Sequence, residues 1–271
     1  MTPAPELMRL LSPTERLALR LADLFARRLR LLPLLSSLLF MGPFIWLLAA
    51  RRLRVSGSEE LQRLPADCSV VLVANHRSYF DFFLVVPVVR LRGHRWFRFY
   101  FPVRADFFYD HPVGVLVNMV GAAMSMFPPI FRRGEKRRLN RWSLLRCAEL
   151  LARPGTGLGL HPEGTRSRGA DPFALLPARP GVGRVVLAAA GVPVIPVFVH
   201  GLGNAVGPEL ARCLLSPRRH PLYVAFGPEV GLADLRERGS TPATEREAAE
   251  RCLSAIAALA ADVQVRIAGH P

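Results

Sequence analysis

Residues 69–89 read SVVLVANHRSYFDFFLVVPVV, and this stretch decides the fold class. Its first six residues are small or apolar and half of them are valine, a composition that is typical of a strand covered on both faces by helices. A short polar turn follows at 75–78, and the apolar residues then resume over a length that favours a helix. A buried strand that runs directly into a helix predicts an α/β domain.

The same succession of apolar runs and helical stretches continues to the end of the chain. We therefore expect one α/β domain over residues 55–271, with a mixed, largely buried sheet flanked by helices. The expected strands are 69–74, 98–103, 156–161, 193–199 and 222–226. The expected helices are 78–91, 111–123, 136–152, 181–190 and 244–267.

Residues 1–54 form a separate N-terminal segment that contains an amphipathic helix. Ser12, Pro13 and Glu15 have the order of an N-cap, a proline at the first helical position and a capping box. Apolar residues then recur at helical spacing opposite a face rich in arginine. This pattern is expected of a helix that packs on the core or of one that lies in a membrane interface.

Residues 31–50 carry no charged side chain and are apolar enough to enter a lipid bilayer. Gly42 and Pro43 interrupt the run, so we expect a helical hairpin that dips into one leaflet. Both of its ends would lie on the cytoplasmic face of the cell membrane. Arginines flank the run on both sides, so the positive-inside rule gives no direction, and a single span is the alternative.

The composition limits the partners of the protein. Its formal net charge is +15, from 36 basic and 21 acidic residues. Such a surplus attracts phosphate, which nucleic acid, anionic lipid headgroups and phosphorylated substrates all provide. The hydrophobic fraction of 51% excludes a largely disordered chain. Four widely spaced cysteines without a CxxC pair argue against a zinc site or a disulfide framework and favour a reducing compartment.

The first polar cluster is the segment NHRSYFD at 75–81, directly after the strand expected at 69–74. Ser78 is placed to cap the next helix, and Asp81 can then curl back over the helix start toward His76. A carboxylate on one imidazole nitrogen fixes the tautomer and leaves the other nitrogen to take a proton from a hydroxyl. The pair predicts a general base with its orienting partner, although a simple helix cap beside a turn histidine has the same spacing.

The second polar cluster is the segment HPEGTRSRG at 161–169, directly after the strand expected at 156–161. A turn of this composition offers backbone amides, hydroxyls and guanidinium groups to a phosphate. A solvated turn with incidental arginines is the alternative.

Together the two clusters resemble the motifs of the glycerolipid acyltransferase family, in which Asn-His and an Asp five positions after the His are followed by Pro-Glu-Gly-Thr-Arg-Ser. Residues 191–197, GVPVIPV, resemble the fourth block of that family. Its bacterial membrane members acylate 1-acylglycerol-3-phosphate. The amphipathic helix and the apolar run that precede the matched residues look like the two-helix membrane motif of these enzymes.

The resemblance implies that a fatty acyl group passes from acyl-CoA or acyl carrier protein to the free hydroxyl of 1-acylglycerol-3-phosphate, giving phosphatidic acid without a metal or other cofactor. Another lysophospholipid or a hydroxyl-bearing lipid is the alternative acceptor. The implied partners are the lysophospholipid, the thioester donor and an anionic membrane surface.

The resemblance also assigns the site residues. His76 is implied as the general base and Asp81 as its charge partner. His161 replaces a large apolar residue of the family, and we interpret it as a variation at the strand end. An irregular second block leaves two candidate arginines. The residues expected at the acceptor phosphate are Arg132 or Arg133, Glu163, Gly164, Thr165 and Arg166.

A basic nucleic-acid-binding protein is the competing class, supported by the charge and by basic-aromatic stretches at 90–104 and 132–142. No nucleic-acid-binding motif accompanies these stretches, so we expect no nucleic acid partner. A nucleophile elbow and a Walker A loop are also absent from the sequence. The glycine-rich segment 201–207 is interpreted as a turn. The remaining histidines share no metal-ligand spacing and are interpreted as structural: His94, His111, His200, His220 and His270.

Overall fold

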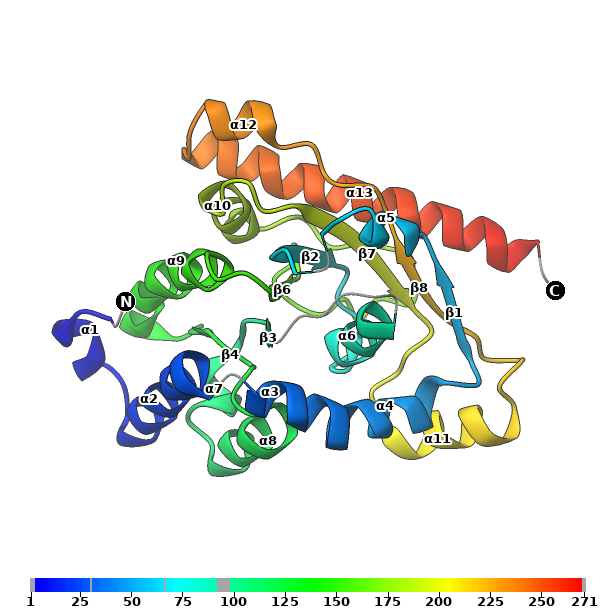
Figure 1. Ribbon diagram of the computed structural model, residues 1–271, viewed down its shortest axis with the longest axis horizontal. Helices are drawn as coiled ribbons and strands as arrows, with labels where there is room; N and C mark the ends of the chain where they lie inside the picture. Colours follow the sequence, from blue (N-terminus) through cyan, green and yellow to red (C-terminus); the bar gives the residue numbers. More distant parts are fainter. Residues whose placement is uncertain (1–2, 30, 66, 92–97, 270–271) are drawn as a thin grey trace.

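The computed structural model describes residues 3–29, 31–65, 67–91 and 98–269, and its centre is a six-stranded sheet with helices on both faces (Figure 1). The strands are short, and most of their side chains are buried. In spatial order they are β1 (Leu53–Ser56), β8 (Leu222–Phe226), β7 (Val194–His200), β2 (Val70–Ala74), β6 (Thr156–Leu160) and β3 (Arg98–Tyr100). The mixed α/β sheet expected from the sequence is thereby confirmed.

The direction of the strands determines where the two polar clusters meet. β2 pairs in parallel with β7 and with β6, and β6 pairs in parallel with β3. Among the strand pairs of the described residues, only β7–β8 is antiparallel, and β1 runs parallel to β8. Since neighbouring parallel strands end at the same edge of a sheet, the residues that follow β2 and β6 emerge side by side.

Alternate residues of β2 contribute to two hydrophobic cores. Val71 and Val73 face a core that includes side chains from α9 (Leu139–Leu151), α10 (Pro180–Ala188) and α13 (Pro242–Ala268). Val70, Leu72 and Ala74 face a second core that includes side chains from α6 (Asp81–Leu91) and α4 (Gly42–Ala49). Burial on both faces explains why β2 is a continuous apolar run.

The expected strand 98–103 is shorter in the structure, because the chain leaves the main sheet after Tyr100. Pro102 has no backbone N–H to offer a neighbouring strand. The next residues form β4 (Val103–Arg104), which pairs with β5 (Pro129–Ile130) in a separate two-stranded sheet. β1, β4 and β5 were not predicted as separate strands, because each is too short to show a hydrophobic pattern of its own.

The five expected helices of the α/β part are present with shifted ends. They correspond to α6, α8 (Pro112–Ala122), α9, α10 and α13, and a 3₁₀ turn, η2 (Gly134–Arg138), precedes α9. The glycine-rich segment 201–207, interpreted as a turn, is a loop over residues 201–205, and a helix begins at Val206. The additional helices are α5 (Glu59–Gln62), α7 (Ala105–Phe108), α11 (Val206–Leu215) and α12 (Ala233–Glu237).

The N-terminal segment is helical, and its expected capping box is confirmed. The short helix α1 (Pro5–Arg9) precedes α2 (Pro13–Arg28), in which the Ser12 side chain and the Glu15 backbone and side chain make the reciprocal bonds of that box. Ala18, Ala22 and Ala26 of α2 are buried in the same core as α9 and α10. The N-terminal segment therefore packs on the α/β part, and a domain boundary at residue 54 stays a prediction.

The hairpin expected at Gly42 and Pro43 is wrong. α3 (Leu31–Ser36), the π-helical segment η1 (Ser37–Met41) and α4 follow one another without a turn and lie along one line in Figure 1. The wider π-helical turn sits just ahead of Pro43, which occupies the first turn of α4, where a missing N–H does not break a helix. Of the helices that the structure describes, none combines the length and the apolar character needed to cross a membrane.

A glycine in α10 tests the packing of this helix against α13. A Cβ atom at Gly183 would overlap the backbone carbonyl of Glu245, so Gly183→Ala should lower the free energy of unfolding by about 1–3 kcal/mol. Gly181 of the same helix faces only the Leu144 side chain at 3.5 Å, and Gly181→Ala is the matched control. Urea unfolding would measure both variants. Equal stabilities would show that α10 and α13 are not held this close.

Candidate active site

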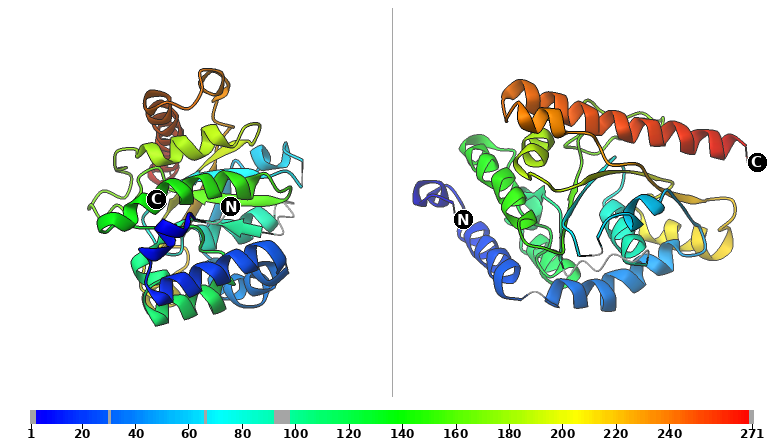
Figure 2. Two further views of the ribbon diagram at one scale, coloured as in Figure 1. Left: turned by 90° about the vertical axis from the view of Figure 1, so that its left-hand side faces the viewer. Right: turned by 45° about the horizontal axis from the view of Figure 1, so that its top comes forward.

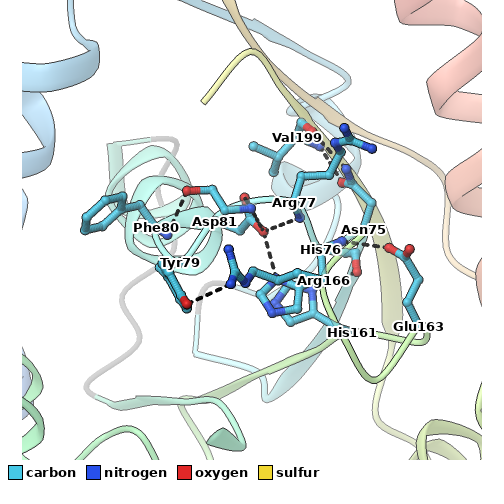
Figure 3. Close-up of polar contacts among 12 residues, drawn as sticks. Asn75, His76, Arg77, Tyr79, Phe80, Asp81, His161, Glu163, Arg166 and Val199 are labelled. Carbon is cyan, nitrogen blue, oxygen red and sulfur yellow. Dashed lines mark hydrogen bonds and ion pairs between the residues drawn. The ribbon is translucent and has the colours of Figure 1, made fainter. Parts of the chain in front are cut away.

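The turns that follow β2 and β6 are bonded to each other (Figure 3). The backbone N–H of His76 donates to Glu163 Oε1 at 2.8 Å, and the N–H of Ser167 donates to the His76 carbonyl at 2.8 Å. Arg77 adds bonds to the Ser167 hydroxyl and to the carbonyls of Gly169 and Asp171. The two clusters predicted from the sequence therefore form one site.

Asp81 is the first residue of α6, and its carboxylate turns back toward the preceding residues. It accepts hydrogen bonds from the N–H groups of Arg77 and Ser78 at 3.0 Å, and Oδ2 lies 3.0 Å from His76 Nδ1. An acidic side chain in the first turn is also stabilised by the helix dipole. Only 3% of the Asp81 side chain is exposed. The carboxylate is thus held in a fixed position beside Nδ1 of the His76 imidazole.

Ser78 does not have the N-cap role that the sequence suggested. The helix begins three residues later, and the Ser78 hydroxyl donates to the Gly203 carbonyl at 2.8 Å and accepts from the N–H of Phe80 at 3.1 Å. The Asp81 carboxylate instead accepts the backbone N–H groups of Arg77 and Ser78, in the turn that precedes the helix. A sequence that places Ser and Asp three positions apart does not distinguish these two arrangements.

The contact with Asp81 determines the protonation of His76. A carboxylate only accepts, so the proton lies on Nδ1 and leaves Nε2 unprotonated. Burial lowers the pKa of His76 to about 3, and the positive charges of Arg166 and Arg132 act in the same direction. Burial raises the pKa of Asp81 to about 6, against the stabilising effect of its hydrogen bonds. At pH 7 the pair is a neutral imidazole on a carboxylate.

His161, interpreted from the sequence as a strand-end variation, lies inside the site. Its ring stacks on that of His76, with centroids 3.9 Å apart and planes 10° apart, and Phe82 lies against it at 4.5 Å. Its Nδ1 donates to the Ala74 carbonyl at 2.9 Å. Burial and the neighbouring His76 lower the pKa of His161 to about 3. The ring is therefore a flat neutral wall that holds the His76 imidazole in place.

His76, Asp81 and His161 bring possible metal-ligand atoms within 4.8 Å of one another. The lone pairs of two parallel, stacked imidazoles point along separate planes and do not converge on one ion. The Nδ1 atoms are both engaged, and the Asp81 carboxylate is bound by backbone amides. The arrangement suits a positioned base better than a metal centre.

The predicted arginines separate into two groups. Arg132 donates to the Gly164 carbonyl at 2.9 Å and so lies on the second turn. The Arg133 side chain is directed away from this turn, and its Nε lies 3.6 Å from Asp106 Oδ2. Arg166 stacks on the Tyr79 ring, 3.7 Å from the centroid, and donates to the Tyr79 hydroxyl at 2.7 Å. Arg132 and Arg166 therefore bring positive charge to the site, as their effect on His76 indicates.

Glu163 has a different environment from the one expected for a phosphate contact. It is almost fully buried, and its two oxygens accept from the N–H groups of His76 and Leu176, each at 2.8 Å. A carboxylate also repels phosphate. Gly164 takes a positive φ of 65°, which a residue without Cβ adopts freely and which exposes its backbone. Thr165 is half-buried beside it.

Several residues of the site had no distinct signal in the sequence. Asn75 holds the end of β2 to β7 through paired bonds with the Val199 backbone at 2.9 and 2.8 Å (Figure 3). Arg77 and Tyr79 belong to the first motif, which implied no role for them, and the position of His161 suggested only a variation at the strand end. His200 stacks on Phe173 with centroids 4.8 Å apart, as expected of a structural histidine. The structural interpretation of His94 and His270 lies outside the described residues.

An apolar cavity of about 40 Å³ lies on the other side of Phe82. Four phenylalanine side chains contribute to its wall, and η1 and the end of α8 also line it. Its lining includes Met41, Phe82, Phe99, Phe101, Gly121 and Ser125. Phe82 contacts His161, which stacks on His76. These two rings therefore separate the cavity from the His76 imidazole.

Comparison with known proteins adds one finding. A model of the family described as Acyltransferase matches residues 52–200, slightly more than half of the chain. The matched range extends from β1 to β7 and contains both turns of the site. No curated protein matches the chain at a significant level.

The protonation of His76 is directly measurable by NMR of ¹⁵N-labelled histidine. We expect a neutral ring with its proton on Nδ1 at pH 7 and no protonation until well below pH 6, because burial and two arginines disfavour the imidazolium. Arg132→Ala should raise the pKa of His76, and Arg133→Ala, the matched control, should leave it unchanged. A protonated His76 at pH 6.5, or a proton on Nε2, would contradict this assignment.

Proposed function

Since the chain belongs to the acyltransferase family, we propose that it transfers a fatty acyl group from acyl-CoA or acyl carrier protein to the free hydroxyl of 1-acylglycerol-3-phosphate, giving phosphatidic acid. The observation that carries the proposal is the 3.0 Å contact between His76 Nδ1 and Asp81 Oδ2, which leaves Nε2 as the proton acceptor. The reaction needs no metal and no further cofactor.

The proposed chemistry begins with proton removal by His76. Nε2 takes the proton of the acceptor hydroxyl as its oxygen attacks the thioester carbonyl, so a C–O bond forms while the imidazole becomes an imidazolium. Asp81 stabilises that cation from the other side. Collapse of the tetrahedral intermediate breaks the C–S bond, and the imidazolium returns its proton to the departing thiolate. The ester and a free thiol result, and His76 is neutral again.

The resting state of the pair suits this role. A base must be unprotonated at the start, and the lowered pKa of His76 meets that requirement at pH 7. The ionised Asp81 then contributes most when the imidazolium forms, that is, in the transition state rather than before it. His161 stacks on the His76 ring and restrains its rotation, so we assign it as a positioning residue.

Two arginines support a phosphate-bearing acceptor. Arg132 and Arg166 lie on or beside the turn 163–166, and both act electrostatically on His76. We assign them, with the backbone of Gly164 and the hydroxyl of Thr165, to the acceptor phosphate. Glu163 is reassigned as a positioning residue that fixes the His76 backbone, and Arg133 is left out of the site because it faces Asp106.

We further propose that the protein works on the cytoplasmic face of the membrane, with residues 31–49 against an anionic lipid surface. Exposed Leu35, Leu39 and Phe40 support this attachment, because such side chains are costly in water. The attachment would be monotopic. It would place the acceptor, itself a lipid, beside the site.

An assay with purified protein tests the proposed function. Lysophosphatidic acid should be acylated faster than lysophospholipids with larger headgroups, with either type of thioester donor. Arg166→Ala and Arg132→Ala should raise the KM for lysophosphatidic acid more than the KM for the donor, because each removes a charged phosphate contact.

Arg133→Ala is the matched control in the same assay and should leave both KM values unchanged, since this neighbouring arginine faces Asp106. If Arg166→Ala weakened binding of the donor alone, the turn 163–166 would be assigned to binding of the thioester carrier instead of the acceptor phosphate. Equal rates on all of these lysophospholipids would exclude the terminal phosphate monoester of lysophosphatidic acid as the recognised group, because the larger headgroups contain a phosphate only as a diester.

A further inference from the structure

Helix α8 has its apolar and polar faces reversed relative to an ordinary surface helix. Its buried residues are Gly114, Asn118 and Ala122, spaced four apart. Asn118 binds the Met126 backbone through both ends of its amide, at 3.3 and 3.2 Å. The apolar stripe, at i, i+3, i+4 and i+7, is exposed instead and consists of Val113, Leu116, Val117 and Val120. A helix normally buries such a stripe.

The neighbouring helices also expose large apolar side chains. α2 exposes Leu17 and Leu24, although it buries Leu19 in the core, and α11 exposes Leu215 while it buries Glu209 and Cys213. α3, η1 and α4 expose a further row of large apolar side chains. This row comprises Leu31, Leu32, Leu35, Leu38, Leu39, Phe40, Trp46 and Leu47.

These helices lie side by side on one side of the molecule. α3 and η1 contact α8, and α4 contacts α11. The Ser36 hydroxyl bonds the carbonyls of Val120 and Gly121 at 3.2 Å, which fixes α3 to the end of α8. Figures 1 and 2 show α2, α3, α4, α8 and α11 together, with α12 and α13 on the opposite side. We call the exposed apolar side chains of these five helices and η1 the apolar face.

The charges around the apolar face select its partner. The only acidic residues in these helices are Glu15 and Glu209, which are buried, and Asp23, which pairs with Arg27 and Arg146. Exposed arginines lie where the helices end. They are Arg27 and Arg28 in the last turn of α2, Arg51 just after α4, Arg54 in β1, and Arg218 and Arg219 after α11.

We propose that α8 and the end of α11, elements of the α/β part, bind an anionic lipid bilayer together with α2, α3, η1 and α4. A bilayer provides apolar chains for the face and phosphates for the arginines at its margin. A second copy of the chain would instead place arginine margins against each other. The proposal rests on the proposed membrane attachment and extends it from the N-terminal segment to the α/β part.

The position of the apolar face connects it to the site. Met41 of η1 and Gly121 of α8 also line the apolar cavity behind Phe82. The contact between η1 and α8 thus lies between the proposed lipid surface and the Phe82 and His161 rings, which adjoin His76. An orientation fixed by α8 and α11, rather than by one N-terminal anchor, would hold this contact against the bilayer.

Vesicle sedimentation of the full chain tests the proposal without using activity. The vesicles contain phosphatidylethanolamine and phosphatidylglycerol, and phosphatidylcholine vesicles serve as the neutral comparison. The variant Leu116→Glu/Val120→Glu changes side chains that are 53% and 56% exposed, so folding should be unaffected. The matched control is Val265→Glu, at a side chain 72% exposed on α13. Circular dichroism and acylation of detergent-dispersed acceptor check folding.

We expect the wild-type chain and Val265→Glu to bind the anionic vesicles equally, and more tightly than neutral ones. Leu116→Glu/Val120→Glu should bind them about tenfold or more weakly, because two apolar side chains no longer enter the lipid. Leu215→Glu should weaken binding in the same direction. Activity on dispersed acceptor should persist in all of them, so a failure of the acyltransferase assignment is seen separately.

Equal vesicle binding by Leu116→Glu/Val120→Glu and the wild type would overturn the proposal. So would a concentration-dependent dimer in sedimentation velocity that this variant abolishes while its vesicle binding persists, because a second copy would then cover the face. A variant that fails to fold is replaced by Leu116→Ser/Val120→Ser, for which the same weakening is expected to be smaller.

Discussion

The buried carboxylate of Asp81 is the interaction on which the rest of the site depends. It accepts hydrogen bonds from the backbone N–H groups of Arg77 and Ser78, in the turn before α6. The same carboxylate lies 3.0 Å from His76 Nδ1. A charge this deeply buried is tolerated only when its hydrogen bonds are satisfied. The backbone N–H groups of this turn and the imidazole therefore stabilise the carboxylate, and the carboxylate in turn orients the imidazole. The second turn is tied to this centre through Glu163, which fixes the His76 backbone.

The sequence predicted the parts of the fold that depend on hydrophobic periodicity. β2, β6, β7 and β8 are buried on most positions, so their apolar runs are unbroken. β1 was missed because it has four residues and none of them is fully buried. The hairpin at Gly42 and Pro43 was wrong because a proline in the first turn of a helix, after a π-helical turn, does not end the helical path.

The site could be predicted in its residues but only partly in its geometry. His76 and Asp81 belong to one local segment, and the short turn between β2 and α6 brings them together. The stacking of His161 on His76 depends on the register between β2 and β6, which no local pattern encodes. The same limit applies to Arg132 and Arg133, adjacent residues whose side chains diverge toward Gly164 and Asp106. The reversed faces of α8 also required the fold, since its periodicity alone suggests burial.

A double-mutant cycle in single-turnover acylation of lysophosphatidic acid tests most directly whether Asp81 acts through His76. His76→Ala should slow the chemical step by about 10²–10⁴-fold, and Asp81→Asn should also slow it, since the amide no longer stabilises the imidazolium. In the His76→Ala background, Asp81→Asn should then add little further loss, with folding of each variant verified by its melting temperature. Losses that multiply independently, or near-normal turnover by His76→Ala, would contradict the central role of this pair.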